Sequence, residues 1–166
     1  MGYSGHSREE LVKAVSLVIV ILLFFASVCY GMSALGHAVK GKECVERGEC
    51  DEAIDHFTQA IATGGFDSRN LASLYNNRGI AYSMRKDYDK ALDDFTMAMK
   101  VDPSSALPAY NMACLHSLMK KPEESCSWLR KAMEMGYDDW SRIKADATLD
   151  NIRDLPCYKE VTAGKQ

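Results

Sequence analysis

Apolar residues follow two different patterns along the chain. Between Val15 and Val28 most residues are Val, Ile, Leu or Phe, and no polar face interrupts them. From Ala34 onward, apolar residues instead recur every three or four positions among charged ones. The second pattern is typical of amphipathic helices that bury one face. We therefore expect an all-α protein, in which one strongly apolar helix precedes a set of amphipathic helices.

The apolar segment is long enough to span a membrane. No charged residue occurs within 14–36, and a transmembrane helix needs about 20 mainly apolar residues. We expect a polar tail at 1–13, a transmembrane or signal-anchor helix at 14–36, and a single-pass protein of the cell (inner) membrane. Basic residues flank the segment on both sides, so the side of the membrane that holds the rest of the chain stays open.

A cleaved signal peptide is the alternative, and it would make the protein periplasmic or secreted. Small residues allow cleavage after Gly31, Ser33 or Ala38. A cut after Ala38 would remove the start of a helix expected from Ala34 to Arg47, and is disfavoured for that reason. The uncharged length of the segment favours its retention, with the membrane helix passing directly or through a bend into the next helix.

Three segments of the remaining chain align with one another, starting at Ala34, Ala72 and Ala106. Each combines two columns of small residues, which allow two antiparallel helices to approach closely, with a column of large apolar residues and a further alanine column. The four columns are Gly41, Gly79 and Ala113; Ala53, Ala91 and Ser125; Phe57, Phe95 and Leu129; and Ala60, Ala98 and Ala132. Each segment is therefore expected to fold as helix, turn and helix.

Turn residues divide each segment at the same place. The expected turns are marked by Gly48, by Lys86-Asp87 and by Lys120-Lys121-Pro122. Pro122 also suits the first turn of the helix that follows. Asp102-Pro103 is expected to end the second helical pair.

These segments resemble tetratricopeptide repeats, at 34–67, 72–105 and 106–139. The second is the best match, because the family's characteristic residues all stand in place: Tyr75, Gly79, Tyr82, Ala91, Phe95, Ala98 and Pro103. The first departs from the pattern at Lys40 and Cys44, and the third at Ser125 and Tyr137. The resemblance implies an α-solenoid, in which stacked helical pairs form a concave surface.

The segment 138–166 resembles the closing segment of many bacterial tetratricopeptide repeat proteins. A terminal repeat leaves an apolar face uncovered, so we expect a helical cap there. The residues able to cover that face are Trp140, Ile143, Leu149, Ile152, Leu155 and Tyr158.

The resemblance also implies a site, because the concave face of such repeats binds peptides or partner helices. We expect the groove to be lined by Lys42, Val45, Asn76, Ile80, Ser83, Met84, Tyr110, Cys114, Ser117 and Leu118, with Ala38 and Glu46 at its first-repeat end. Most of these side chains are uncharged, which favours an apolar or mixed peptide. Alternatively, the closing segment or a second copy of the chain fills the groove. The basic clamp by which some relatives hold a carboxylate is missing, since Ala38, Leu107 and Asn111 stand at its positions.

Composition and motifs argue against other functions. The net charge is -3 and no basic block occurs, which argues against a nucleic-acid partner. We find no catalytic motif and no residue spacing typical of a metal or cofactor site, so we do not expect an enzyme. His56 and His116 are interpreted as packing residues, and Asp93-Asp94 as a solvated helix face.

The six cysteines do not form a clear disulfide framework. Cys44 could pair with Cys50, or Cys114 with Cys126, but most of the six are expected to be small buried thiols. The leading hypothesis is a membrane-tethered adaptor that binds a partner protein or peptide. The alternatives are a structural subunit of a membrane complex, a self-associating scaffold, and a secreted repeat protein.

Overall fold

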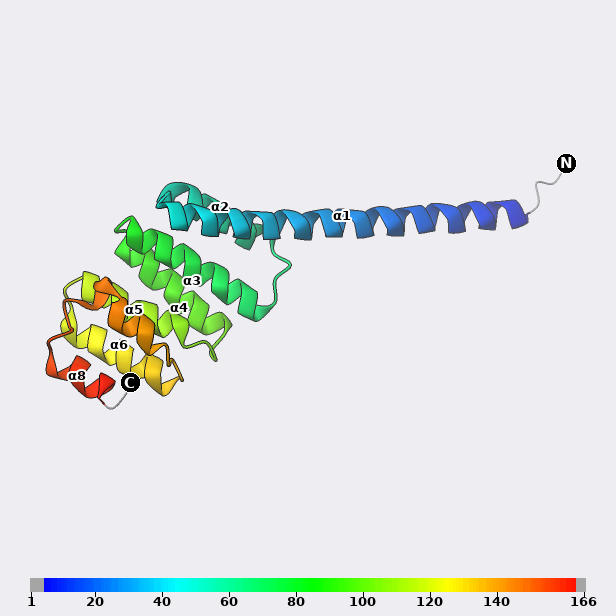
Figure 1. The fold of residues 1–166 in the computed structure, drawn as a ribbon. Coiled ribbons are helices and arrows are strands. Elements are labelled where there is room, and N and C mark those ends of the chain that lie inside the picture. The colour runs from blue at the N-terminus through cyan, green and yellow to red at the C-terminus, as the bar shows by residue number, and fades with distance from the viewer. Residues whose placement is uncertain (1–4, 164–166) are drawn as a thin grey trace.

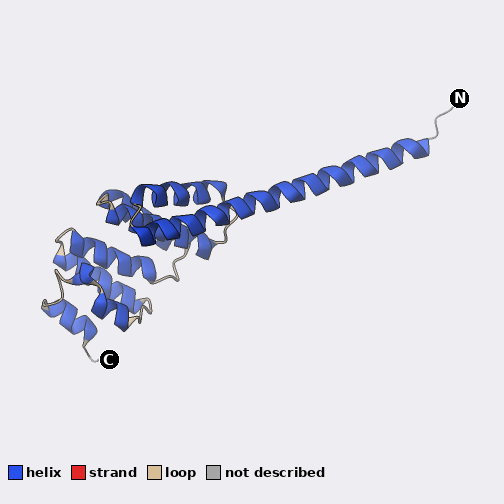
Figure 2. Cartoon of the chain, turned by 45° about the horizontal axis from the view of Figure 1, so that its top comes forward, coloured by secondary structure: helices blue, strands red, loops and turns tan. Residues whose placement is uncertain are grey.

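The structure is a computed structural model that describes the backbone of residues 5–163 and the side chains of 9–24 and 33–163. The described chain is helical throughout, with short loops between the helices (Figures 1 and 2). The elements are α1 (Gly5–Arg47), α2 (Cys50–Thr63), α3 (Ser68–Met84), α4 (Tyr88–Val101), α5 (Leu107–Leu118), α6 (Pro122–Glu134), α7 (Trp140–Ala145), the 3-10 helix η1 (Ala147–Leu149) and α8 (Pro156–Thr162).

Consecutive helices pack in pairs, α1 with α2, α3 with α4 and α5 with α6, as the repeat pattern predicted. The glycine column makes the close approach possible. A Cβ atom built on Gly41 would lie 2.7 Å from the Phe57 ring, and one built on Gly79 would lie 2.7 Å from the Phe95 ring. Both rings are buried completely or almost so. The absence of a side chain on α1 and α3 is therefore what lets α2 and α4 insert a phenylalanine.

The turns inside the repeats share one backbone conformation. Gly48, Lys86 and Lys120 all have positive φ angles, of 75°, 68° and 58°. In each turn, the amide of the following residue donates to a carbonyl five residues earlier, a bond that closes the end of the first helix. The three equivalent turns therefore place each second helix antiparallel to the first.

One polar pair inside the second repeat differs from our expectation. Asp94 is buried, and both of its oxygens accept from Arg78, at 2.8 Å each. Arg78 also donates to Thr58 Oγ1 at 3.0 Å, and its hydrogen bonds to Asp94 raise the pKa of the guanidinium. The interpretation of Asp93-Asp94 as a solvated face is therefore wrong for Asp94, while Asp93 is exposed. Asp94 links α4 to α3, and Arg78 extends the link to α2.

The closing segment folds back onto the third repeat, as predicted. Ile143, Leu149, Ile152 and Tyr158 are buried in one cluster with the α5–α6 core, and Trp140 and Leu155 pack against its edge. A disulfide between Cys126 of α6 and Cys157 of α8 fastens the segment. The suggested Cys114–Cys126 and Cys44–Cys50 pairs are not formed, since Cys44, Cys50 and Cys114 are free thiols. Cys44 and Cys114 are buried, as expected of small thiols.

The first helix is much longer than its repeat partner. Figure 1 shows α1 running straight from the repeats toward the N-terminus without a break. The helix includes both Gly31 and Gly36, at which a bend was the alternative. Large apolar side chains at 11–24 are exposed. In the part of the chain that the structure describes, no helix has an apolar stretch long enough to cross a membrane.

The predicted segments overlap in part with residues that lie outside the described ones. The side chains of 25–32, inside the predicted span 14–36, are among these. So are residues 1–4 of the tail 1–13, and residues 164–166 of the closing segment 138–166.

Candidate functional site

The structure gathers half of the predicted groove residues around one cavity, which we call the repeat–cap cavity. Its volume is about 180 Å³. The predicted residues that line it are Ile80, Ser83, Met84, Cys114 and Leu118. Phe95 and Asn111 of the repeats, and Arg142, Asp146 and Thr148 of the closing segment, complete the lining.

A second cavity, which we call the first-repeat cavity, continues along the same side. Its volume is about 380 Å³, and Lys42, Val45 and Glu46 of α1 line it together with Ile80 of α3. Ile80 therefore borders both cavities. Ala38, by contrast, is buried in the core cluster that α1 and α2 form with α3.

Three predicted groove residues lie in the interior and do not line the open surface. Asn76, Tyr110 and Ser117 are 2%, 0% and 0% exposed. The side-chain amide of Asn111 donates to Asn76 Oδ1 at 2.7 Å, which links the second repeat to the third. A partner cannot contact these side chains, because Asn76 is buried at the junction of the second and third repeats and Tyr110 and Ser117 lie under the closing segment.

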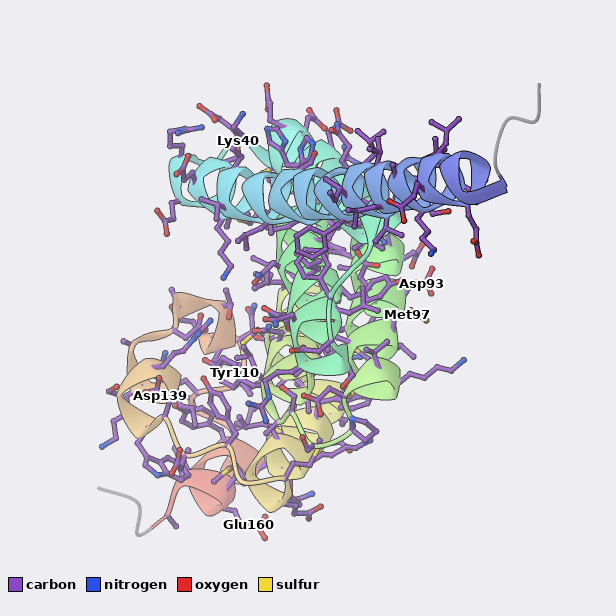
Figure 3. All side chains as sticks on the ribbon, turned by 90° about the vertical axis from the view of Figure 1, so that its right-hand side faces the viewer. Lys40, Asp93, Met97, Tyr110, Asp139 and Glu160 are labelled. Atoms are coloured by element: carbon purple, nitrogen blue, oxygen red, sulfur yellow. A yellow bond between two sulfur atoms is a disulfide. The ribbon has the colours of Figure 1, made fainter. Side chains whose placement is uncertain are left out.

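Tyr110 is covered by the closing segment. Its ring stacks on Tyr137 with the ring centroids 4.4 Å apart, and its hydroxyl donates to Asp146 at 2.7 Å. Burial is the main reason why the pKa of Tyr110 is raised. Figure 3 shows Tyr110 between the repeats and the closing segment. Asn151 also donates to the carbonyl of Ser117, at 3.0 Å. The closing segment thus covers Tyr110 and Ser117 of the concave surface, as one alternative anticipated in part, whereas Met84 of α3 and Leu118 of α5 stay exposed.

Asp146 is the most fully bonded carboxylate of the site. Besides Tyr110, its oxygens accept from the Thr148 amide at 3.0 Å and from the Thr148 hydroxyl at 2.6 Å. Burial raises the pKa of Asp146, but these hydrogen bonds outweigh it and the net shift is downward. Burial also raises the pKa of Cys114 to about 12, which favours the neutral thiol.

Arg142 stands at the rim of the repeat–cap cavity. Its guanidinium lies over the Tyr110 ring, 5.5 Å from the ring centroid, and the residue is exposed. Sequence reasoning missed Arg142, Asp146 and Thr148 because it treated the closing segment as packing only. The available signal was the polar residues interleaved among the apolar ones between Trp140 and Leu149.

The described residues contain no cluster of three side chains able to hold a metal ion. His37 and His56 approach each other with their Nδ1 atoms 3.1 Å apart, across α1 and α2. Burial lowers the pKa of His116, which favours its neutral form.

Comparisons with known proteins support the resemblance. Residues 72–105 match the tetratricopeptide repeat family model. The heat shock protein sti1 homolog of Schizosaccharomyces pombe is 42% identical over 67 residues, which are 40% of this chain and 11% of that protein. A chloroplastic protein of Arabidopsis thaliana is 30% identical over 78 residues, 45% of this chain and 23% of that protein.

A longer but weaker match covers most of the chain. Sperm-associated antigen 1 of Mus musculus is 27% identical over 132 residues, 76% of this chain and 14% of that protein. The chain thus spans less than a quarter of the length of each of these three relatives. Residues 72–105 are a tetratricopeptide repeat, and the chain that carries them is similar to proteins of the tetratricopeptide repeat family.

Proposed function

We propose that this chain is a repeat adaptor without enzymatic activity, which binds a segment of a partner protein in its concave groove. The observation that carries the proposal is the exposure of Met84 (45%) and Leu118 (36%), at equivalent positions of the second and third repeats. Both line the repeat–cap cavity. Exposed large apolar side chains that gather around a cavity are typical of binding sites.

The match to the repeat family supports this function. Stacked helical repeats bind peptides and partner helices on their concave surface, and binding requires no reactive group. The relative from Schizosaccharomyces pombe is itself named a heat shock protein. The partner of this chain is expected to be a protein.

The test is recovery of partners with variants of the cavity. We expect Met84→Asp and Leu118→Asp to abolish co-purification of proteins that the unmodified full-length chain retains, because each buries a carboxylate against an apolar partner. Thr96→Asp is the matched control, since Thr96 is exposed on α4 and lines neither cavity. Figure 3 shows its neighbours Asp93 and Met97 on a side of the molecule away from Tyr110. Equal recovery with all three variants would contradict the groove assignment.

We further propose that the N-terminal part of α1 anchors the adaptor in a membrane. The uncharged segment 14–36 and the exposed apolar side chains at 11–24 support this proposal. Extraction of the native protein by alkaline carbonate tests the anchor. Mass analysis of its N-terminus tests the alternative, a cleaved periplasmic or secreted form. Protease accessibility in intact cells or spheroplasts would then assign the side of the membrane.

The three relatives described above are eukaryotic, so the bacterial type suggested by the closing segment stays a prediction.

Self-association is a second candidate, favoured by one observation. Leu35 and Val39 are exposed on α1 and line a separate cavity with Phe66. Light scattering of the full-length chain in detergent, with and without Val39→Asp, tests this possibility. A strict monomer for both forms would contradict it.

A further inference from the structure

We propose that Arg142 of the closing segment makes the repeat–cap cavity selective for a peptide that carries an acidic side chain next to a large apolar one. This inference rests on the proposed function, and it names the chemistry of the partner. It also gives the closing segment a second role besides covering the third repeat.

The preference for a large apolar side chain is explained by the cavity walls that the repeats supply. Ile80, Met84 and Leu118 line the cavity from α3 and α5, with Phe95 of α4 among them. A dry cavity of roughly 150 Å³ can hold a benzene molecule. The repeat–cap cavity, at about 180 Å³, therefore has room for one large apolar side chain of a partner.

The preference for an acidic side chain comes from the two charged groups that the closing segment places in the cavity wall, Asp146 and Arg142. They differ in whether other side chains of the protein already bind them. The Asp146 carboxylate keeps its negative charge, but its oxygens already accept three hydrogen bonds from Tyr110 and Thr148 within the chain. Among residues 9–24 and 33–163, by contrast, no ion pair or side-chain hydrogen bond uses the Arg142 guanidinium. The neighbouring Asp139 carboxylate accepts from Ser141 and from the backbone amide of Arg142.

The position of the guanidinium is suited to binding a carboxylate. It lies over the Tyr110 ring, which is itself held by Tyr137 and Asp146. This contact restricts the arginine before any partner binds and leaves the edge of the guanidinium accessible. A carboxylate can accept two parallel hydrogen bonds from that edge.

The first-repeat cavity also carries one cation and one anion, Lys42 and Glu46. It differs in its anion, because no hydrogen bond or ion pair among the described side chains uses the Glu46 carboxylate, whereas Asp146 is held by Tyr110 and Thr148. A preference for a partner carboxylate is therefore expected at the end of the groove next to the closing segment. A basic peptide would place like charges together there, which opposes its binding.

Arg142 lies outside the repeats, and the clamp positions of the repeats are occupied by Ala38, Leu107 and Asn111. The proposed contact is therefore a property of this chain's closing segment.

Selection from a phage library of random 12-residue peptides tests the proposal. The full-length chain, kept in solution with a mild detergent, is compared with Arg142→Gln and Lys144→Gln. The control removes the same charge from the same helix, since Lys144 is exposed on α7 but does not line the cavity. We expect unmodified protein and Lys144→Gln to enrich peptides with Asp or Glu beside Leu, Ile, Met or Phe. Arg142→Gln is expected to enrich peptides without the acidic residue.

Titration of one enriched peptide gives the size of the effect without depending on the fold of a variant. Replacing the acidic residue of the peptide by its amide is expected to weaken binding to the unmodified protein about three- to tenfold, since the arginine is exposed. The same replacement is expected to have no effect on binding to Arg142→Gln. Higher salt should weaken binding of the acidic peptide only.

Two other outcomes would overturn different parts of the account. The role of Arg142 is contradicted, without affecting the proposed function, if the enriched peptides require Met84 but show no preference for Asp or Glu. It is also contradicted if Arg142→Gln enriches peptides with the same acidic preference as the unmodified protein. If no enriched peptide loses binding to Met84→Asp, the proposed function fails, and this inference fails with it.

Discussion

In the second repeat, Arg78 and Asp94 form a buried ion pair between α3 and α4, whereas the equivalent residues of the third repeat are Met112 and Trp128. Met112 is buried and Trp128 packs against the same apolar cluster. The neighbouring columns differ as well, with Gly79 and Phe95 in the second repeat and Ala113 and Leu129 in the third.

The difference shows that complementary pairs, rather than single residues, define the repeat. A phenylalanine on the second helix requires a glycine on the first, and a leucine leaves room for an alanine. The third repeat also adds a hydrogen bond from Ser125 to the Ala113 carbonyl, at 2.7 Å, where the other repeats have alanine.

The largest effect is expected from breaking the ion pair. Asp94→Ala leaves Arg78 partly buried without its partner, and we expect a loss of about 2–4 kcal/mol in the free energy of unfolding. Arg78→Met with Asp94→Trp introduces the third-repeat pair and should recover most of that loss. Urea unfolding followed by circular dichroism measures both variants. A double variant no more stable than Asp94→Ala would show that the two pairs are not exchangeable.

A smaller loss is expected from the glycine column. Gly79→Ala gains roughly 1 kcal/mol of helix propensity but places a methyl group against the Phe95 ring, an overpacking that costs about 1–3 kcal/mol. We expect a net loss of about 1 kcal/mol. Adding Phe95→Leu converts the pair to the Ala–Leu form of the third repeat and should make the alanine favourable. The thermal midpoints of the two single variants and the double variant would show this coupling, and strictly additive shifts would argue against it.

The turns provide a prediction of opposite sign. Lys86 and Lys120 adopt positive φ, where the first repeat has Gly48. A left-handed conformation costs a non-glycine residue roughly 1 kcal/mol, so Lys86→Gly and Lys120→Gly should each stabilise the chain by about 0.5–1 kcal/mol. Gly48→Lys should destabilise it by a similar amount. Unfolding midpoints that move in the other direction would contradict the shared turn geometry.

The smallest effect is expected on the stability of the folded chain at acidic pH. It distinguishes the third repeat, which the closing segment covers in part, from the second repeat. The pKa of Asp146 is lower in the folded chain than its ordinary value of 3.8. Its stabilisation is therefore present above about pH 4 and is lost as the pH falls through the folded-state pKa. Asp146→Asn should reduce the loss of stability between pH 4 and pH 2, and Asp93→Asn, an exposed control, should not. Identical acid profiles for both variants would show that Asp146 does not couple the closing segment to Tyr110.

The sequence predicted the repeats well because small and large residues recur at fixed spacing, and that spacing determines which residues meet. It also identified the apolar residues of the closing segment. It missed the burial of Asp94, because an aspartate next to exposed Asp93 gives no sign of an arginine one helix away. It likewise missed the Cys126–Cys157 bond, whose partners are 31 residues apart.

The groove was only partly predictable, for a similar reason. Repeat positions identify the residues that face the concave side, but they do not show which of them another segment covers. Met84 and Leu118 are exposed on this surface, while Tyr110 and Ser117 lie under the closing segment. The covering depends on the way the chain returns after α6, and this path is set by long-range contacts.

Photo-crosslinking in living cells tests the central claim most directly. A photoreactive amino acid at position 84 of the full-length chain is expected to form a covalent adduct with a partner protein, because Met84 is exposed in the repeat–cap cavity. The same amino acid at position 96, an exposed position of α4, is expected to form none. An adduct of equal yield at position 96, or no adduct at position 84, would contradict the account.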